Sequence, residues 1–374
     1  MDADPITVES IELREVSIPL TSPFVTRYGT EHSKRALLVI LRKGELVAYG
    51  ECVAGIGGSY SRETIASARE VIVRQLAPIL LNRSLERPAD FLEATEAIHG
   101  HNMAVATVEM ALWDLQGKME GVSISTLLAG VRGEIDACVT IGIQSSPGQL
   151  LDKLRDFIEQ GYRAVNLKIK PGFDVDYVRA VRTHFPNVSL RTDANAAYRM
   201  EDPRLIQLDK FELSLIEQPL AQHDLNAHSK LQKKLSTPIC LDESIQSPED
   251  ARKAIRMGAC RVINVKPGRV GGINRSCEIH EFCVDHNVPV FCGGMLEAGI
   301  GRAFDVAVAT LPGFTVPSDL SASRRYFTKD LIKNEFELTQ DGKLTVPTGI
   351  GCGVAVDEPY LDSVTISSEI LSRR

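Results

Sequence analysis

Hydrophobic and polar positions along this chain follow two different patterns, and the first one predicts strands. Residues 6–20 are rich in β-branched side chains, and two further apolar runs, 36–41 and 47–50, flank a turn at residues 43–44. Such runs, bounded by turn residues, are typical of β-strands. The segment 21–32 between the first two runs is polar and contains a glycine, so we expect a loop there.

The pattern becomes helical after residue 62. Between residues 63 and 117, apolar side chains recur at helical spacing, most clearly in Val105, Val108, Leu112 and Leu115. Strands followed by helices, without alternation, predict a separate α+β domain over residues 1–130.

From about residue 136, short apolar strands alternate with amphipathic helices at a nearly constant interval. The expected strands are 138–143, 164–170, 189–193, 214–217, 239–242, 262–266, 290–292 and 315–316. Eight strands with connecting helices predict a parallel β/α barrel over residues 131–325. An open doubly wound sheet is the alternative, but no GxGxxG follows an early strand. Residues 326–374 are rich in turns and strand-like, and we expect them to return to the first domain.

Ionisable residues fall at the ends of five successive predicted strands. They are Lys168 and Lys170, then Asp193, Glu217, Asp242 and Lys266. The intervals from Lys170 to Lys266 are 23, 24, 25 and 24 residues, so each is one strand-helix unit. In a β/α barrel these positions lie at the mouth, where active sites are found.

The three carboxylates would converge on one point, where their repulsion calls for a cation. A set of oxygen ligands favours a hard divalent ion, and we expect one Mg²⁺, for which Mn²⁺ could substitute. No histidine or cysteine stands at an equivalent strand end, which argues against zinc. The alternative for any one acid is a helix cap or a salt bridge, but three acids in register favour a metal site.

The lysines flank the acids on both sides. Lys168 and Lys170 are two residues apart on a strand, so their side chains would point the same way, about 7 Å apart. Two neighbouring ammonium groups would lower each other's pKa, which suits a general base. Lys266 would approach from the other side. This layout suits removal of an α-proton beside a carboxylate, although a solvated strand end remains the alternative for the first two lysines.

Composition excludes several classes of partner. The formal net charge is −7 and no basic block occurs, so we expect neither nucleic acid nor an anionic membrane surface as a partner. The longest aliphatic run, residues 36–41, is far short of the roughly 20 residues that span a membrane. Eight scattered cysteines without a CxxC pair indicate reduced thiols and a cytoplasmic location.

Several motifs give the chain a family resemblance over nearly its whole length. They are Lys168-Ile169-Lys170, Asp193-Ala194-Asn195, Glu217-Gln218-Pro219, Asp242-Glu243-Ser244, the stretch from Lys266 to Gly272, and the segments 50–54, 293–302 and 318–326. With these motifs the chain resembles the muconate-lactonising branch of the enolase superfamily, and within it the o-succinylbenzoate synthase/N-succinylamino acid racemase family. The resemblance implies a (β/α)7β modified TIM barrel with an N-terminal α+β capping domain that the C-terminal segment completes.

The resemblance also implies roles for individual residues. Asp193, Glu217 and Asp242 would hold Mg²⁺, Lys170 would be the base with Lys168 tuning it, and Lys266 would stabilise an enediolate or act from the opposite face. Asn195 and Glu243 would support the metal ligands. The implied substrate-binding residues are Arg269, Gly293, Met295, Thr26 and Tyr28, and an arginine at position 269 resembles members that racemise. Segments 21–32 and 55–61 would close over the barrel mouth.

The activity implied first is o-succinylbenzoate synthesis, a dehydration of a cyclohexadiene carboxylate in menaquinone biosynthesis. The alternative is racemisation of N-succinylamino acids, as a sole or second activity. Other muconate-lactonising reactions are less favoured, and a non-catalytic barrel would lack these ligands and lysines. We expect a small carboxylate as substrate and a homo-oligomeric enzyme.

Overall fold

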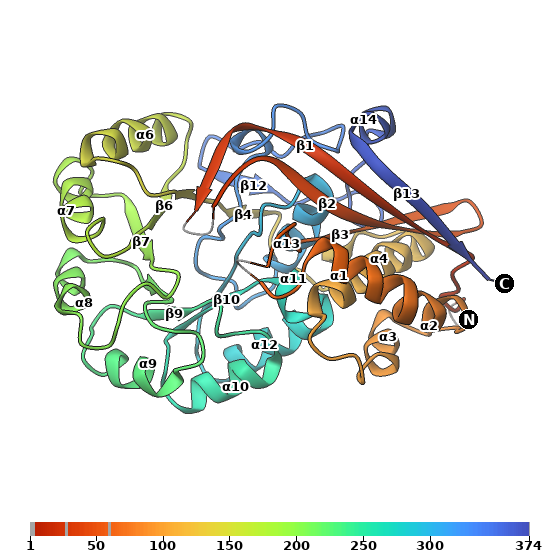
Figure 1. The fold of residues 1–374 in the computed structure, drawn as a ribbon, viewed down its shortest axis with the longest axis horizontal. Coiled ribbons are helices and arrows are strands. Elements are labelled where there is room, and N and C mark those ends of the chain that lie inside the picture. Colours follow the sequence, from red (N-terminus) through yellow and green to blue (C-terminus); the bar gives the residue numbers. More distant parts are fainter. Residues whose placement is uncertain (1–3, 27–28, 59–60, 374) are drawn as a thin grey trace.

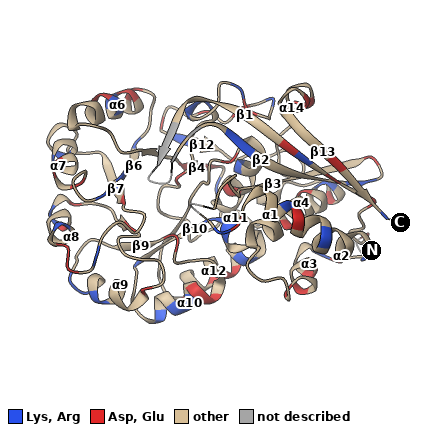
Figure 2. Cartoon of the chain, viewed as in Figure 1, with Lys and Arg blue, Asp and Glu red and all other residues tan. Residues whose placement is uncertain are grey.

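The computed structural model describes residues 4–26, 29–58 and 61–373. Its strands form three sheets, of which two dominate the molecule: a four-stranded sheet in the order β13-β1-β2-β3 and a seven-stranded sheet in the order β11-β10-β9-β8-β7-β6-β5. Figure 1 shows the first sheet beside the helices α1–α4 and the second surrounded by the helices α6–α12. Acidic and basic residues are interspersed along the outer helices α6, α7, α8 and α10 (Figure 2).

The four-stranded sheet is built on a long hairpin. Its strands are β1 (Ser10–Thr26), β2 (Gly29–Lys43) and β3 (Leu46–Cys52), all antiparallel. The loop expected over residues 21–32 is therefore wrong: the ladder continues through Phe24↔Glu31 to Thr26↔Gly29, after a register shift that follows Pro19. Backbone pairing thus extends the hairpin through this polar segment.

Helices cover one face of this sheet. They are α1 (Ile65–Val71), the π-helical turn η1 (Ile72–Leu76), α2 (Ala77–Leu81), α3 (Pro88–Ala94) and α4 (Asn102–Glu120), and α5 (Ile124–Leu127) follows. Helix α4 lies directly against β3. A Cβ atom on Gly50 would stand 2.0 Å from the carbonyl oxygen of Thr107, so this close approach requires glycine.

The second sheet consists of seven parallel strands, which alternate along the chain with seven helical segments. The strands are β5 (Cys138–Ile141), β6 (Ala164–Lys168), β7 (Ser189–Asp193), β8 (Ile216–Glu217), β9 (Ile239–Leu241), β10 (Val262–Val265) and β11 (Val290–Cys292). The helices are α6 (Pro147–Glu159), α7 (Val175–His184), α8 (Pro203–Leu208) with the 3₁₀ turn η2 (Asp209–Phe211), α9 (Leu225–Gln232), α10 (Pro248–Arg256), α11 (Pro267–Val270) with α12 (Ile273–Asp285), and α13 (Gly299–Val308).

Residues 314–319 close this sheet into a barrel without forming a regular strand. Cys292 accepts a backbone hydrogen bond from Asp319, and on the opposite side Cys138 donates one to Ser318. The eighth strand expected at residues 315–316 is thus replaced by isolated bridges. Pro317 has no backbone N–H to donate, which prevents a continuous ladder at this position. The (β/α)7β fold class is confirmed, with the last strand reduced to these bridges.

The C-terminal segment runs back across the molecule. A two-stranded sheet joins β4 (Glu134–Asp136) to β12 (Lys343–Thr345), after the 3₁₀ turn η3 (Ser323–Arg325). After α14 (Glu358–Val364), the last strand, β13 (Thr365–Ser372), pairs antiparallel with β1.

The strand β2 in the middle of the first sheet is buried on both of its faces. On β2, Leu37, Val39 and Leu41 belong to a core shared with the helices α1–α4. The intervening Ala36, Leu38 and Ile40 belong to a second core that extends through the barrel. Alternate residues of a strand point to opposite faces, so the unbroken apolar run follows from this double burial.

The cysteines and the lengths of the apolar helices are as follows from the structure. All eight cysteines are unpaired, and seven of them are buried. Among the residues that the structure describes, no helix is both long and apolar enough to cross a membrane.

The contact between β3 and α4 leads to a stability prediction. Gly50→Ala should lower the free energy of unfolding by about 1–3 kcal/mol, because the new methyl group meets the backbone of α4. Gly133→Ala is the matched control, since a Cβ there would have no atom within 4 Å. Urea unfolding of both variants measures the difference, and equal stabilities would contradict the close approach.

Candidate active site

Three carboxylates meet at the barrel mouth. Asp193 and Glu217 are the last residues of β7 and β8 and pair in register, and Asp242 directly follows β9. One ligand atom from each lies within 4.8 Å of the others, and the three residues are at most 2% exposed. The structure therefore brings together the three acids whose spacing predicted convergence.

The electrostatics of these acids show the cost of gathering them. Burial raises the pKa of Glu217 well above its ordinary value, and the neighbouring Asp193 and Asp242 raise it further. Burial also opposes ionisation of Asp242, but Arg269 and Lys266 outweigh it and lower the pKa of Asp242 to about 2. Buried like charges at this distance need a counter-charge, and the set could hold a metal ion.

Two lysines supply positive charge from opposite sides of the triad. Lys168 Nζ, at the end of β6, donates to Asp193 Oδ2 at 2.5 Å, and Lys266 Nζ, directly after β10, donates to Asp242 Oδ2 at 3.0 Å. Burial lowers the pKa of Lys168, but Asp193 and Glu217 outweigh it, so the net shift is upward. This direction is opposite to the one expected for a lysine pair.

Lys170 lies apart from these groups. The strand β6 ends at Lys168, and Lys170 forms a tight turn with Phe173, with its Nζ 4.9 Å from the phenyl centroid. Its side chain is exposed, and it does not line the cavity described below. Lys168 belongs to the ladder of β6, whereas Lys170 pairs with Phe173 in the turn that follows, so the two lysines have different surroundings.

The expected supporting residues surround the triad. Asn195 donates its backbone N–H to Asp193 Oδ1 at 2.8 Å and its side-chain amide to Glu243 Oε1 at 2.9 Å. Arg269 is buried and donates to Asp242 Oδ1. Arg269 thus contacts Asp242, and Glu243 contacts Asn195. Neither Arg269 nor Glu243 lines the cavity described below.

Two asparagines that the sequence analysis did not single out hold Glu217. Asn264 Nδ2 donates to Glu217 Oε1 at 2.7 Å, and Asn166 Nδ2 donates to Glu217 Oε2 at 3.4 Å. Both asparagines are at most 1% exposed and stand two residues before a lysine, on the inward face of β10 and β6. A polar residue at such an inward position of an apolar strand is the signal that could have revealed them.

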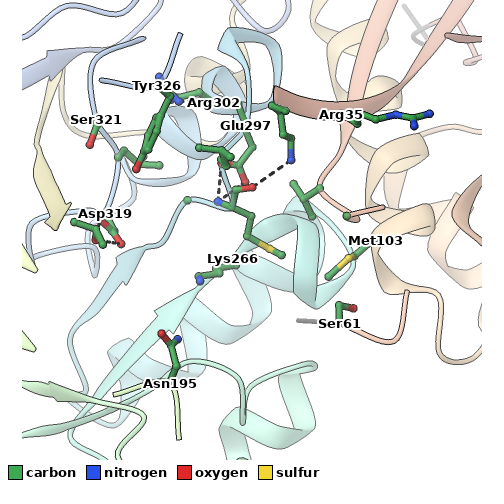
Figure 3. Close-up of a pocket in the computed structure, with 18 of the residues that line it drawn as sticks. Arg35, Ser61, Met103, Asn195, Lys266, Glu297, Arg302, Asp319, Ser321 and Tyr326 are labelled. Carbon is green, nitrogen blue, oxygen red and sulfur yellow. Dashed lines mark hydrogen bonds between the residues drawn. The ribbon is translucent and has the colours of Figure 1, made fainter. Parts of the chain in front are cut away.

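A cavity of about 410 Å³ borders Asp193 of the triad and is lined by residues of both the barrel and the first domain (Figure 3). From the barrel it is lined by Lys168, Asp193, Asn195, Lys266, Met295 and Asp319, and from the first domain by Thr30, Lys34, Arg35, Gly55, Ile56 and Ser61. Both segments expected to close over the mouth therefore contribute to its wall.

The substrate-binding residues expected from the resemblance are placed unevenly. Met295 lines the cavity. Gly293 does not, and a Cβ there would stand 2.2 Å from Asn264 Oδ1, so its small size makes room for that asparagine. Thr26 belongs to β1, but its side chain lies outside the described part of the chain, and Tyr28 lies outside the described residues.

Comparison with known proteins agrees with this architecture. Residues 9–129 match the mandelate racemase/muconate lactonizing enzyme N-terminal domain, and residues 149–360 match the enolase C-terminal domain-like family. The chain belongs to the mandelate racemase/muconate lactonizing enzyme family of the enolase superfamily.

Individual members of the enolase superfamily are similar over almost their full length. The chain is 43% identical to an o-succinylbenzoate synthase of Geobacillus kaustophilus, over 98% of both chains. It is also 43% identical to an N-succinylamino acid racemase of Amycolatopsis sp., over 96% of this chain and 97% of the relative. A crystal structure of an enolase superfamily member from Listeria innocua has a TM-score of 0.95 and 41% identity, covering 98% of this chain and 99% of that one.

Repulsion within the triad leads to a prediction about metal binding. Glu217→Gln should raise the thermal midpoint of the metal-free protein, because a buried charge is removed and either asparagine can turn its unpartnered Oδ1 toward the new amide. The rise in midpoint on adding Mg²⁺ should become smaller than in the unmodified protein. Thermal melts with and without the ion test this, with the exposed Glu201→Gln as control. An undiminished rise would contradict a ligand role for Glu217.

Proposed function

We propose that the protein is an o-succinylbenzoate synthase. The reaction is the syn-dehydration of 2-succinyl-6-hydroxy-2,4-cyclohexadiene-1-carboxylate through an enediolate, in menaquinone biosynthesis. The observation that carries this proposal is one cavity lined by two lysines on either side of a buried carboxylate triad. Relatives of that name, similar over nearly their whole length, support it.

The donor set fits one Mg²⁺. Three buried carboxylates offer only oxygen ligands, and their mutual repulsion is the feature that a hard divalent cation relieves. Asp193, Glu217 and Asp242 would hold the ion, with Mn²⁺ as a substitute. When bound, such an ion supplies a Lewis acid that stabilises negative charge on a carboxylate oxygen.

We assign the proton transfer to Lys168 rather than to Lys170. Lys168 lines the cavity next to Asp193, whereas Lys170 is exposed beyond the strand end. In the dehydration, Lys168 would act as the neutral amine, released from its ion pair with Asp193 when that carboxylate holds the ion. It would take the proton from the carbon beside the substrate carboxylate and then return it to the departing hydroxyl on the same face. Lys266, as a cation on the opposite face, would stabilise the enediolate.

A second activity, racemisation of N-succinylamino acids, is favoured by the same pair of lysines. Racemisation needs a base on each face of the α-carbon, and Lys168 and Lys266 approach the triad from opposite sides. Arg269 would assist by holding Asp242 beside Lys266. Relatives named N-succinylamino acid racemase support this candidate.

The organisation of the chain follows as part of the proposal. Residues 1–130 would form the capping domain, 131–325 the catalytic barrel and 326–374 a segment completing the cap, which the pairing of β13 with β1 supports. Unpaired cysteines throughout support a cytoplasmic location. We also propose a homo-oligomeric enzyme acting on a small carboxylate.

The choice between the two lysines gives a direct prediction. Lys168→Ala should lower kcat for dehydration by roughly 100-fold or more, the usual contribution of a general base. Lys170→Ala should keep most of kcat, since its side chain lies outside the cavity. Steady-state kinetics of both variants decide the assignment. The reverse order of losses would return the base to Lys170.

The two activities are separated by proton NMR in D₂O. The purified enzyme is given Mg²⁺ and either the dehydration substrate or each enantiomer of an N-succinylamino acid. We expect dehydration, and exchange of the α-proton in both enantiomers if both lysines act. Lys266→Ala should then block exchange in one enantiomer only, because only one face loses its base. Dehydration without exchange would identify a dedicated synthase, and no reaction at all would refute the proposed function.

A further inference from the structure

A buried lysine of the first domain reaches the cavity. Lys34 lies in β2, is 5% exposed and lines the cavity wall. Its only hydrogen bond among the described residues is a long one, from Nζ to the carbonyl oxygen of Met295 at 3.4 Å. An ammonium group has three donors, so Lys34 retains hydrogen-bonding capacity on a residue taken out of water.

The carboxylates near Lys34 accept hydrogen bonds from backbone N–H groups rather than from Lys34. Glu51 accepts the backbone N–H groups of Ala298 and Gly301, each at 2.8 Å. Both carboxylate oxygens of Glu297 accept the backbone N–H of Met295. Glu51 attracts Lys34 through space, but no described carboxylate forms an ion pair with it within 4.0 Å.

A second buried cation borders the same part of the cavity. Arg302 is 2% exposed, and its Nη2 donates to the Glu297 carbonyl oxygen at 2.8 Å, while its Nη1 has no hydrogen-bond partner. Its guanidinium carbon stands 5.8 Å from the ring centroid of Tyr326. Figure 3 shows Arg302 and Tyr326 on the opposite side of the cavity from Lys266 and Asn195.

Cations thus border the cavity at two places, the second of them beside the buried carboxylates of Glu51, Glu297 and Asp305. One is the site of Lys168 and Lys266, where the reacting carboxylate would be held. The other is Lys34 with Arg302, which donate to the nearby carbonyl oxygens of Met295 and Glu297. The wall also includes apolar side chains such as Val53, which suits the carbon skeleton of a substrate with a charge at each end.

We propose that Lys34 is the specificity-determining residue for a second carboxylate on the substrate, held at the cap side of the cavity with Arg302 behind it. The inference rests on the proposed function, since both candidate substrates carry a succinyl group with its own carboxylate. A charge-assisted hydrogen bond from Lys34 selects the dicarboxylate over neutral acyl analogues.

The experiment compares an acid with its neutral ester. The succinylated substrate of whichever reaction the enzyme catalyses is measured beside the same molecule with the succinyl carboxylate methylated. We expect kcat/KM for the ester to be lower by roughly 10- to 100-fold, the contribution of a hydrogen bond to a charged group. Lys34→Met should lower kcat/KM for the acid toward that of the ester, mainly through KM, and Lys34→Arg should restore part of the preference.

A matched control comes from a second half-buried lysine of the same domain. Lys118 pairs with Asp114 at 2.7 Å and does not line the cavity, so Lys118→Met should keep the ratio of acid to ester. Equal kcat/KM values for acid and ester in the unmodified enzyme would overturn the subsite while leaving the proposed function standing. This comparison needs no variant, so it decides the matter even if Lys34→Met does not fold. Failure of every substrate would refute the proposed function and the subsite with it.

Discussion

Repulsion among three buried carboxylates is the constraint to which the rest of the barrel mouth responds. Asp193, Glu217 and Asp242 each place one ligand atom within 4.8 Å of the others and are almost wholly excluded from water. Such an arrangement is unstable unless every neighbour compensates for it. Lysines and an arginine pair with the two aspartates, while two asparagine amides hold Glu217. Most of the polar chemistry of the site can therefore be understood as compensation for this one cluster.

The barrel supplies this cluster through strand register. Asp193 pairs with Glu217, and Lys168 pairs with Asp193, so their relative heights are set by backbone hydrogen bonds. Side chains at the ends of neighbouring parallel strands are held close together by this register, so their positions do not depend on the conformation of a loop. The cap then adds the wall that the barrel lacks, including Lys34 and the segment 55–57.

Much of this arrangement could be predicted from the sequence, because the interval between strand ends equals the length of one strand-helix unit. The triad and Lys266 follow from that spacing. The proposed base moves from Lys170 to Lys168 because interval counting does not show where a strand ends, and β6 stops at Lys168. The prediction of a loop over residues 21–32 was wrong for a different reason. Backbone pairing forms a hairpin there, and such pairing does not need apolar side chains. Asn166 and Asn264 escaped notice because their contacts depend on the barrel being closed.

Burial of β2 on both of its faces limits how the enzyme can admit its substrate. Leu38 and Ile40 of β2 belong to the same packed core as the barrel strands, so swinging the whole cap outward would expose that core to water. A rigid-body hinge between cap and barrel is therefore too costly to operate in each turnover. Substrate entry and product release therefore require a local rearrangement of the cavity rim. Gly55, Ile56 and Gly57 form part of this rim and make few contacts with the rest of the protein. Turnover and cap docking are thereby decoupled, and mutations that speed product release should map to the rim rather than to the interface between the domains.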